Sequence, residues 1–255
     1  MTRPIFLGLL LRGWQLEAQA SKWAVVIAHR GEHLKHPENT IAAIQGAIEA
    51  GADYVELDVR TTADGEFVLM HDSDVSRMTN GHGEVAAMTL AEIKRLEVGR
   101  NSGTRVPTFD EALAFTRGKI GVYVDAKRIP AAGTIAAIDR HDMGEHVVIY
   151  GGKPYLAEIV AQRPKWKVMP EAENPAHAKS LLAAMPLQVM AFDARDFNDE
   201  TIRVAREAGV AIHVDRLGPA DSPKFWQDAI DRGATGIQTD HPAELVAYLK
   251  AKGYR

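Results

Sequence analysis

Residues 25–40 read VVIAHRGEHLKHPENT, and the order of residue types in this stretch predicts how the whole chain is organised. The apolar run at 25–28 is typical of a β-strand that is buried on both faces. It ends abruptly at His29 and Arg30, and a helical pattern begins shortly afterwards. In parallel α/β folds the carboxyl ends of strands carry the functional side chains. The stretch therefore predicts a buried strand that delivers two basic groups to a site.

The same alternation recurs along the rest of the chain. Apolar, strand-like segments occur at residues 25–29, 54–59, 120–127, 147–151, 167–171, 189–194, 211–215 and 236–240. Segments with helical periodicity follow them at 38–50, 108–117, 131–140, 153–162, 175–185, 199–208, 221–232 and 242–252. Eight such units in 255 residues predict an α/β fold, a (β/α)8 TIM barrel that forms one domain over residues 23–255.

One connection is much longer than the others. Residues 60–107 separate the second strand from its helix, and they open with two β-patterned arms around Asp64-Gly65, which predict a hairpin. An even register with a two- or four-residue loop would place His71 opposite Asp58 or Glu56, on the same face. Together with a short helix in residues 89–100, the insertion predicts a small cap over one edge of the barrel mouth.

Composition limits the partners and the ligand chemistry. The net charge of -4, without a block of Lys or Arg, gives no indication of nucleic acid binding. Because the chain has no cysteine, a metal must be bound through oxygen or imidazole. Residues 1–22 fit either a marginal signal peptide, which would mean export, or a short helix under the barrel of a cytoplasmic protein. No other stretch is long and apolar enough for stable membrane insertion.

Three carboxylates fall at the ends of two predicted strands. Glu56 and Asp58 are two positions apart, so their side chains share a face, and Asp125 ends the third barrel strand. Carboxylates that converge in this way repel one another unless a cation lies between them. Hard oxygen ligands suit Mg²⁺ or Ca²⁺. The sequence therefore predicts one divalent cation, bound by Glu56, Asp58 and Asp125.

Basic groups at the same strand ends predict the chemistry. Arg30 and Lys127 beside a metal indicate an anionic ligand, most simply a small-molecule phosphate that bridges them. His29 and His71 supply two imidazoles that can exchange protons near neutral pH. One would deprotonate the attacking hydroxyl, and the other would protonate the leaving alkoxide. The combination predicts cleavage of a phosphate ester, with His29 and His71 as the catalytic residues.

The motifs together resemble the glycerophosphodiester phosphodiesterase family, whose members are TIM barrels of the phospholipase C-like phosphodiesterase type. The resemblance rests on HRG (29–31), PENT (37–40), VELDV (55–59), TADGEFVLMHD (62–72), RMTNGHG (77–83) and GIQTDHP (236–242). It implies a barrel with a small cap, a Ca²⁺ or Mg²⁺ site, and hydrolysis of glycerophosphodiesters to glycerol 3-phosphate and an alcohol. It also implies acid–base roles for the two histidines, and a cyclic phosphate as an intermediate.

The sequence departs from the family pattern near the expected substrate pocket. Asp125-Ala126-Lys127 stands where the family commonly has Glu-x-Lys, and His213-Val214-Asp215 replaces an aromatic segment on the seventh strand. We expect Glu171, His213 and Asp215 to line this pocket. The departures leave two alternatives open: a related substrate such as a lysophospholipid, or an inactive phosphate-binding barrel. The sequence does not specify the leaving alcohol or an oligomeric state.

Other polar residues in the motifs are interpreted as structural. Glu38 reads as an acidic residue in the first turn of a helix, and Asn39 and Asp240 read as helix caps. His33 reads as a surface or loop residue.

Overall fold

A computed structural model describes residues 24–99 and 103–255 of the chain. Over these residues, eight parallel strands follow one another in the order β6-β5-β4-β2-β1-β9-β8-β7. Their bounds are Val25–Ala28 (β1), Tyr54–Thr61 (β2), Gly121–Ala126 (β4), Val147–Tyr150 (β5), Lys167–Met169 (β6), Val189–Phe192 (β7), Ala211–Asp215 (β8) and Gly236–Thr239 (β9). A bridge between Glu171 and Ala191 joins the two ends of this order. The predicted TIM barrel is confirmed.

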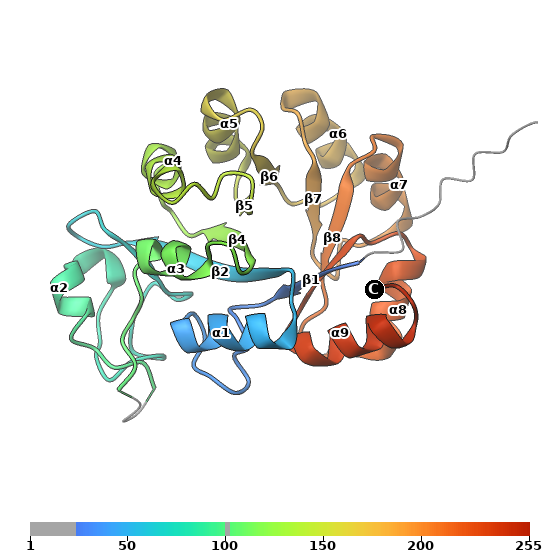
Figure 1. Cartoon of the computed structure of the whole chain (residues 1–255). Coiled ribbons are helices and arrows are strands. Elements are labelled where there is room, and N and C mark those ends of the chain that lie inside the picture. The colour runs from blue at the N-terminus through green and yellow to red at the C-terminus, as the bar shows by residue number, and fades with distance from the viewer. Residues whose placement is uncertain (1–23, 100–102) are drawn as a thin grey trace, which may run out of the picture.

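Helices surround the strands, as Figure 1 shows. Their bounds are Ile41–Ala50 (α1), Phe109–Thr116 (α3), Ala131–Arg140 (α4), Lys153–Gln162 (α5), Pro175–Ala184 (α6), Asp199–Glu207 (α7), Pro223–Asp231 (α8) and Pro242–Ala251 (α9). Local capping chemistry sets several of the ends. The Thr40 side chain accepts a hydrogen bond from the Ala43 amide at the start of α1, and Gly51 adopts a left-handed conformation at its end.

The core has two layers, and the alternation of side chains on the strands separates them. In β2, Val55, Leu57 and Val59 pack outward against helix residues. Glu56 and Asp58 lie between these positions and therefore point into the barrel. The barrel interior is filled by Ile27, Tyr123, Val148, Met169, Val189 and Ala191. The acidic residues of β2 thus lie on the carboxyl-end side of this apolar interior.

The insertion forms the predicted hairpin, but the predicted register is wrong. Strand β3 (Phe67–Leu69) pairs antiparallel with β2, and Val59 lies opposite Leu69. Residues 62–66 form the connecting loop, in which the Thr62 amide bonds to the Glu66 carbonyl at 2.9 Å. This loop is one residue longer than the four-residue alternative. His71 therefore follows the end of β3, and strand alternation does not set the direction of its side chain.

The rest of the insertion builds a small unit of its own beside the barrel, on the left in Figure 1. It contains η1 (Val85–Ala87) and α2 (Leu90–Ile93). Its separate apolar cluster consists of Val68, Met70, Val75, Val85, Ile93, Val98 and Val106. Val75 and Val85, which follow His71 in the sequence, are packed into this cluster.

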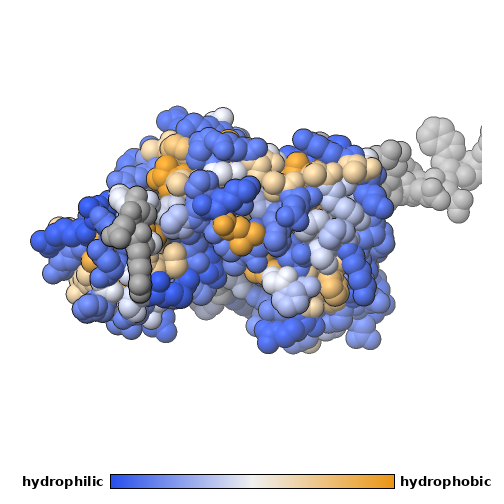
Figure 2. Space-filling model, turned by 90° about the horizontal axis from the view of Figure 1, so that it is seen from below, coloured by the Kyte–Doolittle hydropathy of each residue, from blue (hydrophilic) through white to orange (hydrophobic). Residues whose placement is uncertain are grey.

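The prediction for residues 1–22, a signal peptide or a short helix, falls outside the described residues. Among the helices that are described, none has the length and apolar character needed to cross a membrane. The surface seen from below in Figure 2 is largely hydrophilic, with scattered apolar patches. In the described part of the chain, Leu34 and Phe225 are the exposed large hydrophobic residues.

Candidate active site

The three predicted metal ligands lie together at the carboxyl ends of β2 and β4. Asp58 and Asp125 stand opposite each other in the parallel register, and Glu56 is on the same face. One oxygen from each of the three carboxylates lies within 4.8 Å of the others. Burial raises the pKa of Glu56 well above its usual range, and Asp58 and Asp125 add to the shift. This concentration of buried acidic groups is a site that favours a cation.

Two basic groups border the carboxylates, as predicted. The Lys127 Nζ lies 2.6 Å from Asp125 Oδ2 and 3.4 Å from Asp58 Oδ1. The Arg30 amide donates to Glu56 Oε2 at 2.8 Å, and the Arg30 Nε lies 3.5 Å from Asp58 Oδ2. The ammonium of Lys127 shows that these oxygens accept a cation, and an all-oxygen donor set fits Mg²⁺ or Ca²⁺.

A tight turn brings Arg30 to this position. Arg30 has φ 53° and Gly31 has φ 84°, both in the left-handed region. A Cβ on Gly31 would lie 2.6 Å from the backbone carbonyl carbon of Ala43, in α1. Only glycine therefore fits where the turn packs against the helix.

Asn39 holds Asp58 in place, a role that the sequence did not reveal. The Asn39 Nδ2 donates to Asp58 Oδ2 at 2.7 Å, and the Asp58 amide donates to Asn39 Oδ1 at 3.1 Å. Asn39 is buried, with 3% of its surface exposed, and has φ 57°. The interpretation of Asn39 as a helix cap is wrong, because Thr40 caps α1.

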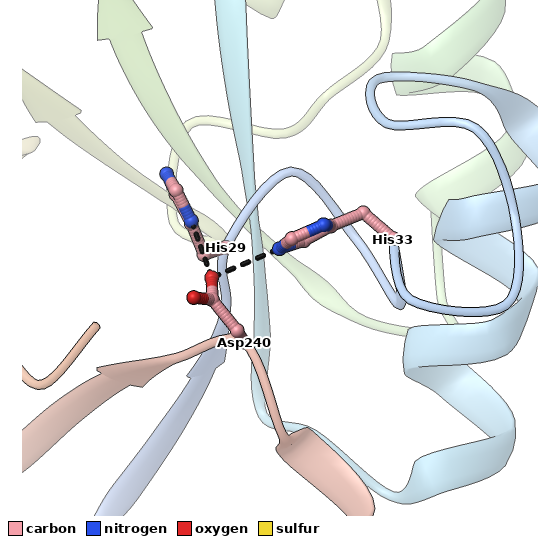
Figure 3. Close-up of side chains that lie close together, drawn as sticks. All are labelled: His29, His33 and Asp240. Carbon is pink, nitrogen blue, oxygen red and sulfur yellow. Dashed lines mark hydrogen bonds and ion pairs between the residues drawn. The ribbon is translucent and has the colours of Figure 1, made fainter. Parts of the chain in front are cut away.

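His29 follows β1 and shares a carboxylate with a second histidine. The His29 Nδ1 lies 2.7 Å from Asp240 Oδ1, and the His33 Nε2 lies 2.9 Å from the same oxygen (Figure 3). Burial acts to raise the pKa of Asp240, but hydrogen bonds from His29 and His33 outweigh it and hold that pKa well below its usual range. The interpretation of Asp240 as a cap is wrong, because His241 occupies the N-cap of α9. His33 lies in a loop, as predicted, but its ring also binds Asp240.

A series of ion pairs holds His71 and links the insertion to Glu38. Its Nδ1 lies 2.7 Å from Asp72 Oδ1, and its ring acts electrostatically on the nearby Asp125 carboxyl. Arg77 binds Asp72 and also donates to Glu38 at 2.6 Å. Arg77 thereby holds the pKa of Asp72 well below its usual range.

The same series of ion pairs extends to Arg30, in the turn after β1. Glu38 accepts a hydrogen bond from the Arg30 Nη1 at 3.2 Å and lies before the cap of α1. Glu38 is therefore not in the first turn of the helix. In the sequence, only the adjacency of Asp72 to His71 could have indicated any of these ion pairs.

Both catalytic candidates have the same arrangement. A carboxylate contacts Nδ1 of each ring, and the hydrogen bonds of the described residues leave Nε2 of His29 and His71 without a protein partner. A carboxylate at Nδ1 favours the tautomer that carries its proton there, because an ionised carboxylate can only accept. Nε2 then keeps its lone pair and can take a proton from another molecule.

Two of the three predicted pocket residues lie at the barrel mouth. Glu171 follows β6 and accepts a hydrogen bond from the Tyr150 hydroxyl. Asp125, Tyr150 and Glu171 line a cavity of about 360 Å³. Asp215 ends β8, and burial raises its pKa to about 7, with contributions from Glu171 and Asp193.

The structure does not place His213 at the mouth. It points into the barrel one layer below Asp215, and it lines a cavity of about 290 Å³ with Val25, Lys167 and Val189, at the opposite ends of the strands. Burial lowers the pKa of His213 to about 4, and Lys167 adds to the shift. The expectation that His213 lines the substrate pocket at the mouth is wrong, because two residues along β8 separate one layer of the interior from the next.

Comparison with known proteins identifies the family of this chain. Residues 29–150 match the glycerophosphoryl diester phosphodiesterase family. A glycerophosphodiester phosphodiesterase of Caldanaerobacter subterraneus is 32% identical over 90% of this chain and 99% of its own, and one of Bacillus subtilis is 29% identical over 90% and 87%. The crystal structure of the Agrobacterium tumefaciens enzyme, 28% identical, superposes with a TM-score of 0.77 over 88% of this chain and 99% of its own.

A structure of lower identity supports the fold alone. The Oleispira antarctica phosphodiesterase, solved with the product sn-glycerol-3-phosphate, is 21% identical and has a TM-score of 0.79 over 89% of this chain and 97% of its own. The identity and coverage of the Caldanaerobacter relative decide the assignment. The chain belongs to the glycerophosphoryl diester phosphodiesterase family of enzymes.

Proposed function

We propose that this enzyme hydrolyses glycerophosphodiesters to glycerol 3-phosphate and an alcohol, with one divalent cation and with His29 and His71 as acid and base. The observation that carries the proposal is the buried carboxylate cluster, bordered by two imidazoles that each contact a carboxylate through Nδ1. The names of the curated relatives supply the substrate class.

Glu56, Asp58 and Asp125 would hold the cation, and their oxygen ligands suit Mg²⁺ or Ca²⁺. When bound, such an ion withdraws negative charge from the phosphoryl oxygens. Arg30 and Lys127 bind the same anionic group from its other sides. The buried Nε of Arg30 lies 3.5 Å from Asp58 Oδ2 but makes no hydrogen bond among the described residues, so it can still donate one to an anion.

The two histidines move the protons. One takes the proton of the attacking hydroxyl at its Nε2, while the other delivers a proton to the oxygen of the leaving alcohol. The negative charge of Asp240 and Asp72 stabilises each ring while it is protonated. The base starts as the neutral ring and the acid as the imidazolium, so the first step yields a cyclic phosphate and the free alcohol and reverses the two protonation states. In the second step the ring that is now neutral takes a proton from an attacking water, and the other ring returns its proton to the glycerol oxygen that leaves phosphorus. This step gives glycerol 3-phosphate and restores both rings.

The test is release of glycerol 3-phosphate from glycerophosphocholine and glycerophosphoethanolamine, in EDTA, Mg²⁺ or Ca²⁺. We expect metal-dependent release that falls by roughly 10²–10⁴-fold in His71→Ala. His82→Ala is the matched control, because His82 is an exposed histidine of the same insertion.

The outcomes separate the alternatives. If the enzyme cleaves an activated diester such as bis(p-nitrophenyl) phosphate but releases no glycerol 3-phosphate from either substrate, it is a phosphodiesterase with another substrate, for example a lysophospholipid. Inactivity toward all of them would indicate a phosphate-binding barrel. Equal activity of His71→Ala and His82→Ala would remove His71 from the mechanism.

A further inference from the structure

His29, His33 and Asp240 form a second group of potential metal ligands, distinct from the carboxylate cluster. One ligand atom from each lies within 4.8 Å of the others. In Figure 3 the two rings approach the carboxylate from different directions, and both nitrogens point at the same oxygen. Their side chains are 15%, 20% and 19% exposed, so the group is shielded but accessible.

The geometry points to a binding site for a transition-metal ion of the Zn²⁺ class at His29, His33 and Asp240, whose occupation inhibits the enzyme. Two imidazole nitrogens and one carboxylate oxygen are the ligands of a three-residue zinc site with an open fourth position. The cluster of Glu56, Asp58 and Asp125 offers only oxygen, which suits Mg²⁺ or Ca²⁺. Ligand chemistry therefore divides the two kinds of ion between the two sites.

The surrounding structure holds these ligands ready. The Gly218 amide donates to Asp240 Oδ2 at 3.3 Å, which leaves Oδ1 for the two histidines. The Glu32 amide donates to the Ala43 carbonyl at 2.9 Å and so fixes the loop that carries His33 against α1. In a tetrahedral site with zinc bonds near 2.0–2.1 Å, neighbouring ligand atoms are about 3.3 Å apart. Widening the present contacts of 2.7 and 2.9 Å to that value requires only small side-chain movements.

Inhibition follows from the tautomer of His29. In the metal-free arrangement its Nδ1 carries the proton that Asp240 accepts, and Nε2 has a lone pair. A metal bound to Nδ1 displaces that proton, so the neutral ring must carry its proton on Nε2. With the metal on Nδ1 and a proton on Nε2, the ring can no longer take a proton, and it can give one up only by becoming an imidazolate. His29 is therefore disabled whether it acts as the base or as the acid.

His33 is the residue that makes the group a metal site. It lies between the HRG and PENT segments and belongs to neither. Without it, one imidazole and one carboxylate would remain, which is a weak donor set for these ions. Replacing His33 therefore separates metal binding from the contact between His29 and Asp240.

The direct test uses Co²⁺, which shares ligands with Zn²⁺ and absorbs visible light when bound. The protein is first saturated with Ca²⁺ and then titrated with Co²⁺. We expect one equivalent to give the absorption of a nitrogen-ligated ion of low coordination number. The affinity should fall at least about tenfold in His33→Asn and His33→Gln. His36→Asn, on the same loop but without a hydrogen bond to Asp240, should bind like the wild type.

The second arm measures inhibition by Zn²⁺ at saturating Ca²⁺, each variant being compared with its own zinc-free rate. The half-inhibitory concentration should rise at least about tenfold in both His33 variants and stay unchanged in His36→Asn. Equal Co²⁺ affinity in the wild type and the folded His33 variants would overturn the site. If the His33 variants bind Co²⁺ more weakly but keep the wild-type half-inhibitory concentration of Zn²⁺, the proposed effect on His29 is overturned. This arm rests on the proposed function, whereas the Co²⁺ titration does not, so the two can fail separately.

Discussion

Replacing Asn39 should damage both the fold and the proposed metal site, because this one side chain holds Asp58 through two hydrogen bonds. Asn39→Gly removes both bonds but keeps a residue that tolerates φ 57°. Asn39→Ala removes the same bonds and adds a Cβ in the left-handed region. The pair of variants therefore separates the loss of hydrogen bonding from backbone strain.

The magnitude follows from the burial of the two groups. Asp58 is 1% exposed and Asn39 is 3% exposed, so no bulk water replaces the lost partners. A hydrogen bond to a charged group contributes about 1.5–3 kcal/mol, and a buried amide without a partner costs about 1–3 kcal/mol. We expect Asn39→Gly to lower the free energy of unfolding by about 3 kcal/mol, and Asn39→Ala to lower it by about 1–2 kcal/mol more.

Urea denaturation measures the stability, and a titration of activity with Mg²⁺ or Ca²⁺ measures the metal site. The concentration of ion for half-maximal activity should rise by about 10–100-fold, because Asp58 loses the contact that orients it. Asp142→Gly is the matched control, since Asp142 also has a positive φ, of 52°, but is exposed. The reasoning would be refuted if Asn39→Gly unfolded within about 0.5 kcal/mol of the wild type with an unchanged ion requirement.

Two further predictions concern the charges around the mouth. Arg77→Met removes the links to Glu38 and Asp72, so kcat/KM should fall by about tenfold in steady-state assays. Arg95→Met is the control, because Arg95 is exposed on the same insertion. An effect of Arg77→Met no larger than that of the control would contradict a role for Arg77 in positioning His71. For Asp215, the folded pKa near 7 exceeds the usual value of 3.8, so wild-type stability should fall as pH rises from 3.8 to 7, where only the unfolded chain releases this proton. In metal-free buffer, urea midpoints of Asp215→Asn should show a weaker fall over this range, and identical slopes for the two proteins would count against the shift.

Local patterns were sufficient to predict the barrel and the clustering of three carboxylates at its mouth. Alternation along one strand placed Glu56 and Asp58 on one face, and strand order brought Asp125 beside them. Partners that are distant in sequence could not be inferred in this way: Asp240 contacts His29 across 211 positions. The direction of His71 depended on the length of one loop, which the residues around Asp64-Gly65 leave open.

The closure of the barrel between β6 and β7 makes its two halves mechanically unequal. In the described chain, this seam has the single bridge from Glu171 to Ala191, supported by backbone bonds of 2.8 and 2.9 Å to the Ala191 peptide. The carboxylates stand instead on β2 and β4, which share a continuous ladder. Widening of the mouth for a bulkier alcohol should therefore occur at the seam, beside Glu171, while β2 and β4, which carry the carboxylates, keep their spacing. Under the proposed function, a different leaving group would be accommodated at this seam, away from the carboxylates of β2 and β4.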